Sequence, residues 1–212
     1  MAVSSLAFNK TCTDLNGCMS EPLTLVNLRA IMLLLTKAHY SDADNFGVFA
    51  EELACLVAED PKSNLNIGLD FIPSAKNPSP RPAIWVNLEG CKFVKKVMDN
   101  RSDGSDDNSR TTYVKIQEVV FNLAHVHESV DIALMMAETT ADFFAGIRPH
   151  LMGKLNISMF EVLEISKPKL TEQAPERYFE VDVVIQMMFS STITTNIESH
   201  RLKKFALDLQ PE

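Results

Sequence analysis

The most regular pattern of apolar and polar positions lies in residues 179–189. Every second position there carries a large apolar side chain, and the positions between them are mostly polar. Successive side chains of a β-strand point to opposite faces, so this alternation predicts a half-buried strand with one apolar face. Burial of each large side chain contributes roughly 1.5–3 kcal/mol, which together can fix the register of the strand. The apolar set is Phe179, Val181, Val183, Ile185, Met187 and Phe189.

A different spacing, of three and four residues, begins after residue 129. This is the spacing of the buried side of a helix, and four acidic residues fall between or beside the apolar positions. We therefore expect these acids to face water rather than to form a catalytic pair. Gly146 and the following Arg148–Pro149 pair predict the end of the helix. The apolar stripe is Val130, Ala133, Leu134, Ala137, Ala141 and Phe144, and the acids are Glu128, Asp131, Glu138 and Asp142.

Two further helices are expected near the start of the chain. Residues 20–40 predict a helix capped by Ser20, with Glu21 and Pro22 in its first turn. Residues 45–58 predict a shorter helix, with a strand as the alternative.

Further strands are predicted along the rest of the chain. Residues 65–72 and 83–88 flank a proline-rich turn and predict a hairpin, which residues 91–99 would extend. Long strands are predicted at 111–127 and 155–165, and a further strand or an extended tail at 194–209. The order of helices, strands, a helix and strands predicts an α+β fold, in which helices pack on one face of a mainly antiparallel, mixed sheet.

The domain organisation follows from length and from two polar segments. The 212 residues suit one domain, which we place at 20–212, preceded by a polar N-terminal arm at 1–19. Residues 99–110 have no apolar side chain able to join a core, and predict a flexible acidic loop. Arg101 and Arg110 stand where a calcium loop needs acids. We expect the loop to be an interface through Asp99, Asp103, Asp106, Asp107, Arg101 and Arg110.

Charge and cysteine spacing exclude several classes of protein. The formal net charge of −8 disfavours tight wrapping of nucleic acid, because that affinity comes largely from Lys and Arg. Cys12, Cys18, Cys55 and Cys91 match no zinc spacing, so we expect reduced thiols in a cytoplasm. No secretory leader is apparent, and the apolar run at 30–35 is too short to span a bilayer.

Catalytic motifs are absent from the sequence. There is no Gly-x-Ser-x-Gly and no phosphate-binding glycine loop, so we expect neither an enzyme nor a cofactor. His125 and His127 would share one side of a strand, and with Glu128 they suggest the alternative of a small cytoplasmic metal-dependent hydrolase. No third ligand is placed to complete such a site. The basic residues at 199–204 are interpreted as a solvated strand end rather than a nucleic-acid patch.

Residues 83–212 also carry a run of elements that can be compared with a known class. It consists of an "IWVN" strand after a proline turn, a "TYVKIQEVVFNLAHVHES" strand leading into an "ALMMAETTADFFAGIRP" helix, a "MFEVLEIS" strand and a closing pair that starts at "RYFEVDVV". This order resembles the tail-terminator and neck proteins of tailed bacteriophages. The early "LRAIMLLLTKAHY" helix fits the same class.

The resemblance implies a structural virion protein, assembled in the host cytoplasm and located in the tail or neck. It implies a homo-oligomeric ring, usually a hexamer, that caps the tail tube and joins it to the head-side connector. The implied partners are the tube or sheath proteins and that connector, while DNA passes through an acidic lumen without specific binding. A head-side connector or neck subunit remains the nearest alternative, and a cytoplasmic regulatory binding module is another.

Overall fold

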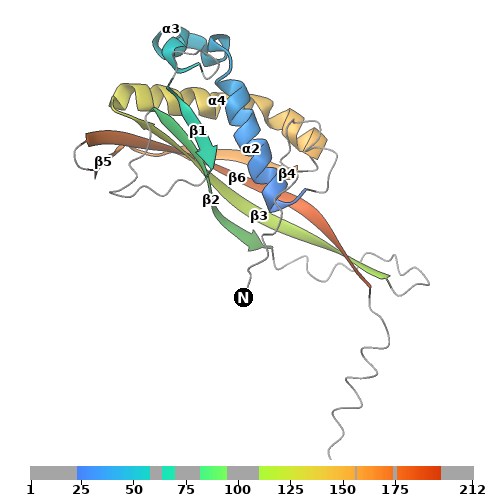
Figure 1. Ribbon diagram of the computed structural model, residues 1–212. Helices are drawn as coiled ribbons and strands as arrows, with labels where there is room; N and C mark the ends of the chain where they lie inside the picture. Colours follow the sequence, from blue (N-terminus) through green and yellow to red (C-terminus); the bar gives the residue numbers. More distant parts are fainter. Residues whose placement is uncertain are drawn as a thin grey trace, which may run out of the picture.

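One mixed sheet and a layer of helices make up the described part of the chain (Figure 1). The computed structural model describes residues 23–57, 64–69, 82–94, 110–155, 157–173 and 176–196. Among these residues, six strands form one sheet in the order β1-β2-β3-β6-β4, and β5 also pairs with β6. The strands are β1 (Asn66–Leu69), β2 (Ala83–Phe93), β3 (Arg110–His127), β4 (Ile157–Ile165), β5 (Lys169–Gln173) and β6 (Glu176–Asn196).

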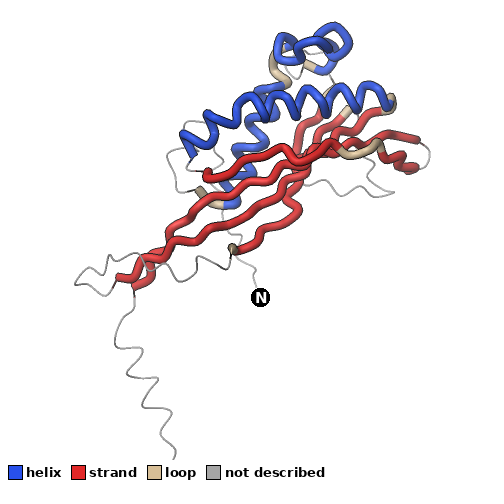
Figure 2. Tube along the Cα trace, turned by 180° about the vertical axis from the view of Figure 1, so that it is seen from behind, coloured by secondary structure: helices blue, strands red, loops and turns tan. Residues whose placement is uncertain are grey.

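The helices lie on one face of this sheet, as both views show (Figures 1 and 2). Helix α2 contacts β1 and β2, whereas α4 contacts β3, β4 and β6. The predicted α+β fold is therefore confirmed, including its mixed sheet and one-sided helical layer. The helical segments are α2 (Leu25–His39), η1 (Ala43–Phe49), α3 (Ala50–Leu53), η2 (Ala54–Leu56) and α4 (Val130–Leu155).

The antiparallel pair of β3 and β6 is the spine of the sheet. Its register runs without a shift from Arg110 opposite Asn196 to His127 opposite Phe179. The predicted strands at 111–127 and 179–189 both lie within this pair, which confirms them. Arg110 belongs to β3 and not to the preceding loop. Both views show the pair continuing past the end of the helical layer (Figures 1 and 2).

The predicted hairpin between the first two strands is wrong. β1 pairs with β2 in parallel, with Asn66 opposite Ala83 and Leu69 opposite Val86. Parallel neighbours need a connection of about a dozen residues, and the interval between Leu69 and Ala83 has that length. The extension of the second strand is confirmed as far as Phe93, after a register shift between Leu88 and Gly90.

The N-terminal helical region begins and breaks at other residues than expected. Helix α2 begins at Leu25, and Thr24 rather than Ser20 caps it, because the Thr24 hydroxyl accepts a hydrogen bond from the Asn27 amide at 3.1 Å. The predicted helix at 45–58 is a succession of short helical turns rather than one helix or a strand. Gly47 interrupts them with a φ of 56°, a value that glycine adopts without strain.

Helix α4 does not end at Gly146, as the sequence suggested. It runs from Val130 to Leu155 and contains both Gly146 and Pro149. Leu151 and Leu155 are buried in the main core, and this packing holds the helix beyond the proline. The carbonyl that loses its donor to Pro149 belongs to the exposed Ala145, where water can replace the missing N–H.

The main core fills the space between the sheet and the helices α2 and α4. Alternate residues of β6 and β3 point into it, together with the predicted stripe of α4 at Ala133, Ala137, Ala141 and Phe144. A smaller cluster lies under the short helical turns and includes Tyr40, Phe46, Leu53, Ile84 and Met136. The members from the two spine strands are Val119, Phe121, Leu123, Val181, Val183, Ile185, Met187 and Phe189.

Several predicted segments lie outside the described residues. They are the arm at 1–19, the loop at 99–109 and the tail from residue 197 onward. Strand β5, conversely, was not predicted. No helix in the described ranges is long and apolar enough to cross a membrane.

The position of Gly146 inside α4 leads to a stability prediction. Gly146→Ala should raise the free energy of unfolding by about 0.5–1 kcal/mol, because alanine restricts the unfolded chain and no atom lies within 4 Å of the added Cβ. Urea denaturation followed by circular dichroism measures the change. A loss of stability would show that the residue ends the helix in a left-handed conformation.

Gly68 of β1 should respond in the opposite direction. A Cβ added there would lie 2.5 Å from the Cζ3 atom of the buried Trp85 ring, closer than packing allows. Gly68→Ala should therefore lower the free energy of unfolding by about 1–3 kcal/mol, as overpacking does elsewhere. The same urea experiment checks this, and an unchanged midpoint would show that the ring moves away at little cost.

Candidate functional site

The acidic residues within and just before α4 face water. Glu128, Asp131, Glu138 and Asp142 are all exposed, while the apolar stripe beside them is buried or half-buried. This confirms that the helix turns its carboxylates to water. A catalytic carboxylate pair on this helix has no geometric support, because general acid–base catalysis needs a pocket that shifts a pKa.

His125 is built into a buried hydrogen-bond network between the sheet and the helices. Its Nε2 lies 2.9 Å from the Thr140 hydroxyl, and its Nδ1 lies 3.2 Å from the Val181 carbonyl oxygen. The Thr140 hydroxyl is also 3.1 Å from the Tyr40 hydroxyl, which donates to the Met136 carbonyl at 3.0 Å. Both ring nitrogens of His125 are thus engaged within the protein, so neither is available to a metal.

His39 lies next to this network without joining it. Its side chain is fully buried, and neither ring nitrogen has a hydrogen-bond partner among the described residues. The ring stacks on Phe143, with 4.6 Å between centroids. Burial, and then the nearby His125, lower the pKa of His39 to about 4. Burial also lowers the pKa of His125 to about 4, against smaller opposing effects of the Val181 and Leu123 backbone and the Asp182 charge.

His127 has a separate structural role at the start of α4. Its Nδ1 accepts a hydrogen bond from the Ser129 amide at 2.9 Å, just before the first helical residue, Val130. Burial lowers its pKa, since a charge is harder to keep in a half-buried position. The described ranges contain no group of three or more His, Cys, Asp or Glu residues that could hold a metal ion. His125 and His127, the histidines of the proposed hydrolase site, both make hydrogen bonds within the protein.

The two buried histidines predict that stability falls in mild acid. Each has a folded pKa near 4 and an ordinary unfolded pKa near 6.5, so the unfolded chain binds more protons between these values. Stability should be fully present above pH 6.5 and decline as the pH falls toward 4. The decline is at most about 3 kcal/mol per histidine. Urea denaturation at pH 7.5, above the transition, and at pH 6 and 5, within it, measures the decline.

Two variants separate this effect from general acid denaturation. His39→Leu removes one titrating group whose ring nitrogens have no partner among the described residues, so it breaks no described side-chain hydrogen bond and should flatten the decline. His150→Gln, at an exposed position of α4, should leave the decline unchanged. Identical pH profiles for the wild type and His39→Leu would contradict the assignment.

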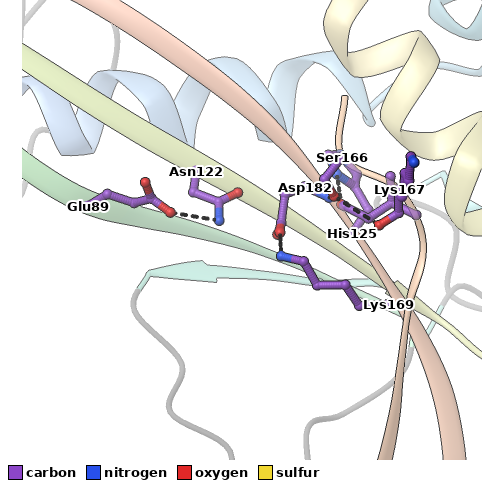
Figure 3. Close-up of polar contacts among 8 residues, drawn as sticks. Glu89, Asn122, His125, Ser166, Lys167, Lys169 and Asp182 are labelled. Carbon is purple, nitrogen blue, oxygen red and sulfur yellow. Dashed lines mark hydrogen bonds and ion pairs between the residues drawn. The ribbon is translucent and has the colours of Figure 1, made fainter. Parts of the chain in front are cut away.

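The face of the sheet opposite the helices carries a second polar group of residues (Figure 3). The Asn122 amide on β3 donates to the Glu89 carboxylate on β2 at 3.1 Å. The Lys169 ammonium of β5 pairs with the Asp182 carboxylate of β6. Figure 3 shows the side chains of each pair pointing toward one another. We call Asn87, Glu89, Asn122, Glu180 and Asp182 the acceptor cluster.

The acceptor cluster contains oxygens that lack donors. The Oδ1 atoms of Asn87, Asn122 and Asp182 are buried and have no hydrogen-bond partner among the described residues. Asp182 itself is 3% exposed. Burial, and then the Asp182 charge, raise the pKa of Glu180, while Lys169 opposes the shift. The hydrogen bond to Asp182, with the nearby Asp182, Glu180 and Glu89 charges, raises the pKa of Lys169. The surroundings are thus rich in negative charge.

The outer edge of the sheet exposes several large apolar side chains. β4 ends the strand order, and no described strand pairs with its outer side. Leu163 and Ile165 of β4 and Leu170 of β5 are 49%, 38% and 51% exposed. At the other end of the sheet, Leu69 of β1 is 38% exposed. Exposed strand edges with apolar side chains are sites where a further strand can add.

The interface predicted at the acidic loop is not tested by the described geometry. Asp99, Arg101, Asp103, Asp106 and Asp107 lie outside the described residues. Arg110 begins β3, but its side chain is not described.

The acceptor cluster was not predicted from the sequence, and its members come from β2, β3 and β6. Its available signal was the run of polar residues on the even positions of the strand at 179–189.

The comparisons with known proteins add little. No protein-family model matches the chain, and no curated protein matches it. Among solved structures, a chain described as "Virion of native gene transfer agent (GTA) particle" is similar over 72% of this chain and 94% of that chain, with 14% sequence identity and a TM-score of 0.29. A likeness of this size does not establish a shared function.

Proposed function

We propose that the protein is a structural virion protein of tailed-phage type. More specifically, it acts as a tail terminator that forms a homo-oligomeric ring, caps the tail tube and joins it to the head-side connector. The order of elements from residue 83 onward supports this proposal through its resemblance to tail-terminator and neck proteins. The same proposal places the protein in the tail or neck of the virion, with the tube or sheath proteins as neighbours.

The observation that carries the proposal is that no described strand pairs with the outer side of β1 or with that of β4 and β5. The β4–β5 edge exposes Leu163, Ile165 and Leu170, and the β1 edge exposes Leu69. Two different edges on one molecule allow a head-to-tail contact, and such contacts close into a ring when the rotation between copies permits. The ring contact we propose joins the β4–β5 edge of one copy to the β1 edge of the next.

The polar interior of the fold supports an architectural rather than a catalytic role. Of the candidates for chemistry, His125 joins β3 to α4 through Thr140, and His127 accepts the Ser129 amide in the turn that leads into α4. A formal net charge of −8 suits a lumen through which DNA passes without specific binding. The loop at 99–110 and the arm at 1–19 are the proposed contacts to the tube or the neck.

Electron microscopy with cognate tail tubes tests the function. The purified chain should form rings, hexamers by our proposal, and should be seen at the head-side end of tubes that lack their terminator. Binding to isolated connectors but not to tubes would instead favour a head-side connector subunit. A chain that neither forms rings nor associates with either structure would remove the proposal.

A substitution at the β4 edge tests the proposed ring contact. Leu163→Lys should change the free energy of unfolding by no more than about 0.5 kcal/mol, because the side chain is already half exposed. It should abolish ring formation, since a buried ammonium at the contact would lack a partner. Analytical ultracentrifugation, with and without tubes, measures the assembly. The matched control is Val48→Lys on η1, which is 87% exposed and outside the β4–β5 edge. Equal assembly of the two variants would place the contact elsewhere.

A further inference from the structure

The acceptor cluster has more hydrogen-bond acceptors than donors. Three carboxylates, those of Glu89, Glu180 and Asp182, lie near one described ammonium, that of Lys169. Three buried amide or carboxylate oxygens have no donor among the described residues. These oxygens are inaccessible to a partner, but the excess of carboxylates over ammonium groups gives the cluster a negative potential that attracts a cationic partner.

The chemistry of the cluster selects a cationic partner. Lysine and arginine side chains offer several N–H donors and no acceptor, and they form their strongest hydrogen bonds with carboxylates. Glu89 is exposed and on the rim of the cluster, whereas Asp182 is 3% exposed and lies deeper. An arriving cation would therefore meet the exposed Glu89 carboxylate first and then the half-buried Glu180 carboxylate.

This chain carries a segment of matching charge. Arg201, Lys203 and Lys204 place three cations within four residues, in the tail that follows the end of β6 at Asn196. The tail as a whole has no net side-chain charge, because Glu198, Asp208 and Glu212 balance these three cations. The basic run at 201–204 and the cluster have opposite charge, and both occur on every copy of the protein.

The length of the extended backbone after Asn196 decides whether the basic residues can bind the cluster of their own chain or only that of another copy. Asp182 lies fourteen residues before Asn196 on β6, a distance of about 46 Å along the strand. Asn122 lies opposite Val184, about 40 Å from Asn196. A fully extended backbone from Asn196 covers only about 28 Å by Lys204. The three cations therefore cannot reach the cluster of their own chain as a group.

We propose that residues 197–212 of one copy dock on the acceptor cluster of a neighbouring copy. Arg201, Lys203 and Lys204 pair there with the accessible Glu89 and Glu180 carboxylates, and the buried Asp182 charge adds to the attraction. This docking rests on the self-association in the proposed function, and it adds a second contact on the sheet face opposite the helices. Each copy would then be joined to its neighbour both by a sheet edge and by a tail.

A synthetic peptide of residues 197–212 tests the docking directly. The receptor is the full chain carrying Arg201→Gln, Lys203→Gln and Lys204→Gln, so that its own tails do not compete. The labelled peptide should bind in a fluorescence anisotropy titration at about 50 mM salt and should weaken as the salt concentration rises. A peptide with the same three substitutions is the matched control and should bind at least about tenfold more weakly.

Variants of the receptor locate the site. Glu89→Gln keeps an acceptor for the Asn122 amide and changes only the charge of an exposed residue, so the fold should persist while peptide affinity drops about tenfold. Asp182→Asn should weaken binding further. Glu138→Gln, an exposed position on α4 at the opposite face, should leave affinity unchanged. Circular dichroism of each variant confirms that it is folded.

The outcomes separate this inference from the proposed function. No binding, or equal affinity of the wild-type and charge-neutralised peptides, overturns the docking even if the wild-type chain caps tail tubes. Equal affinity for the wild-type and Glu89→Gln receptors overturns the assigned site. Charge-dependent peptide binding by a chain that never caps tubes supports the docking and removes the tail-terminator role.

Discussion

The register between β3 and β6 is the constraint on which the rest of the structure depends. It runs unshifted over the whole of β3, so odd-numbered residues of both strands face the helices and even-numbered residues face away. A slip of one residue would turn Val183, Ile185 and Met187 out of the core and place Asp182 inside it. The apolar face of β6 excludes that alternative, because the lost burial would amount to several kcal/mol.

The same register carries a polar group into the core. His125 is on an odd position of β3, so it lies under α4 with the apolar residues. Thr140 and Tyr40 supply its hydrogen-bond partner and a link onward to the Met136 carbonyl. This network ties α2, α4 and the sheet together at defined atoms, which an apolar contact alone does not do. His39, stacked on Phe143 and without a hydrogen bond in the described structure, makes the region sensitive to acid.

The even-numbered residues of β3 and β6 face away from the helices and form a polar surface. Glu180 and Asp182 of β6, with Asn122 of β3 and Glu89 of β2, gather acceptors on the face that the helices leave uncovered. Together with the apolar edge at β4 and β5, this gives the molecule two kinds of surface suited to contact with other chains. An assembly role uses both, and the proposed ring and tail contacts differ in physical character: one is apolar and strand-like, the other charged and sensitive to salt.

Local patterns in the sequence determined the strands at 111–127 and 179–189, the buried stripe of α4 and the exposure of its acids. These depend on periodicity, which burial against any neighbouring layer enforces. Only the tertiary structure decided that β1 runs parallel to β2, because connection length permits more than one pairing. It also decided that α4 passes Gly146 and Pro149, where the burial of Leu151 and Leu155 outweighs local propensity. The acceptor cluster could not be predicted, since it joins strands more than ninety residues apart, from Glu89 to Asp182, through pairings that no single segment encodes.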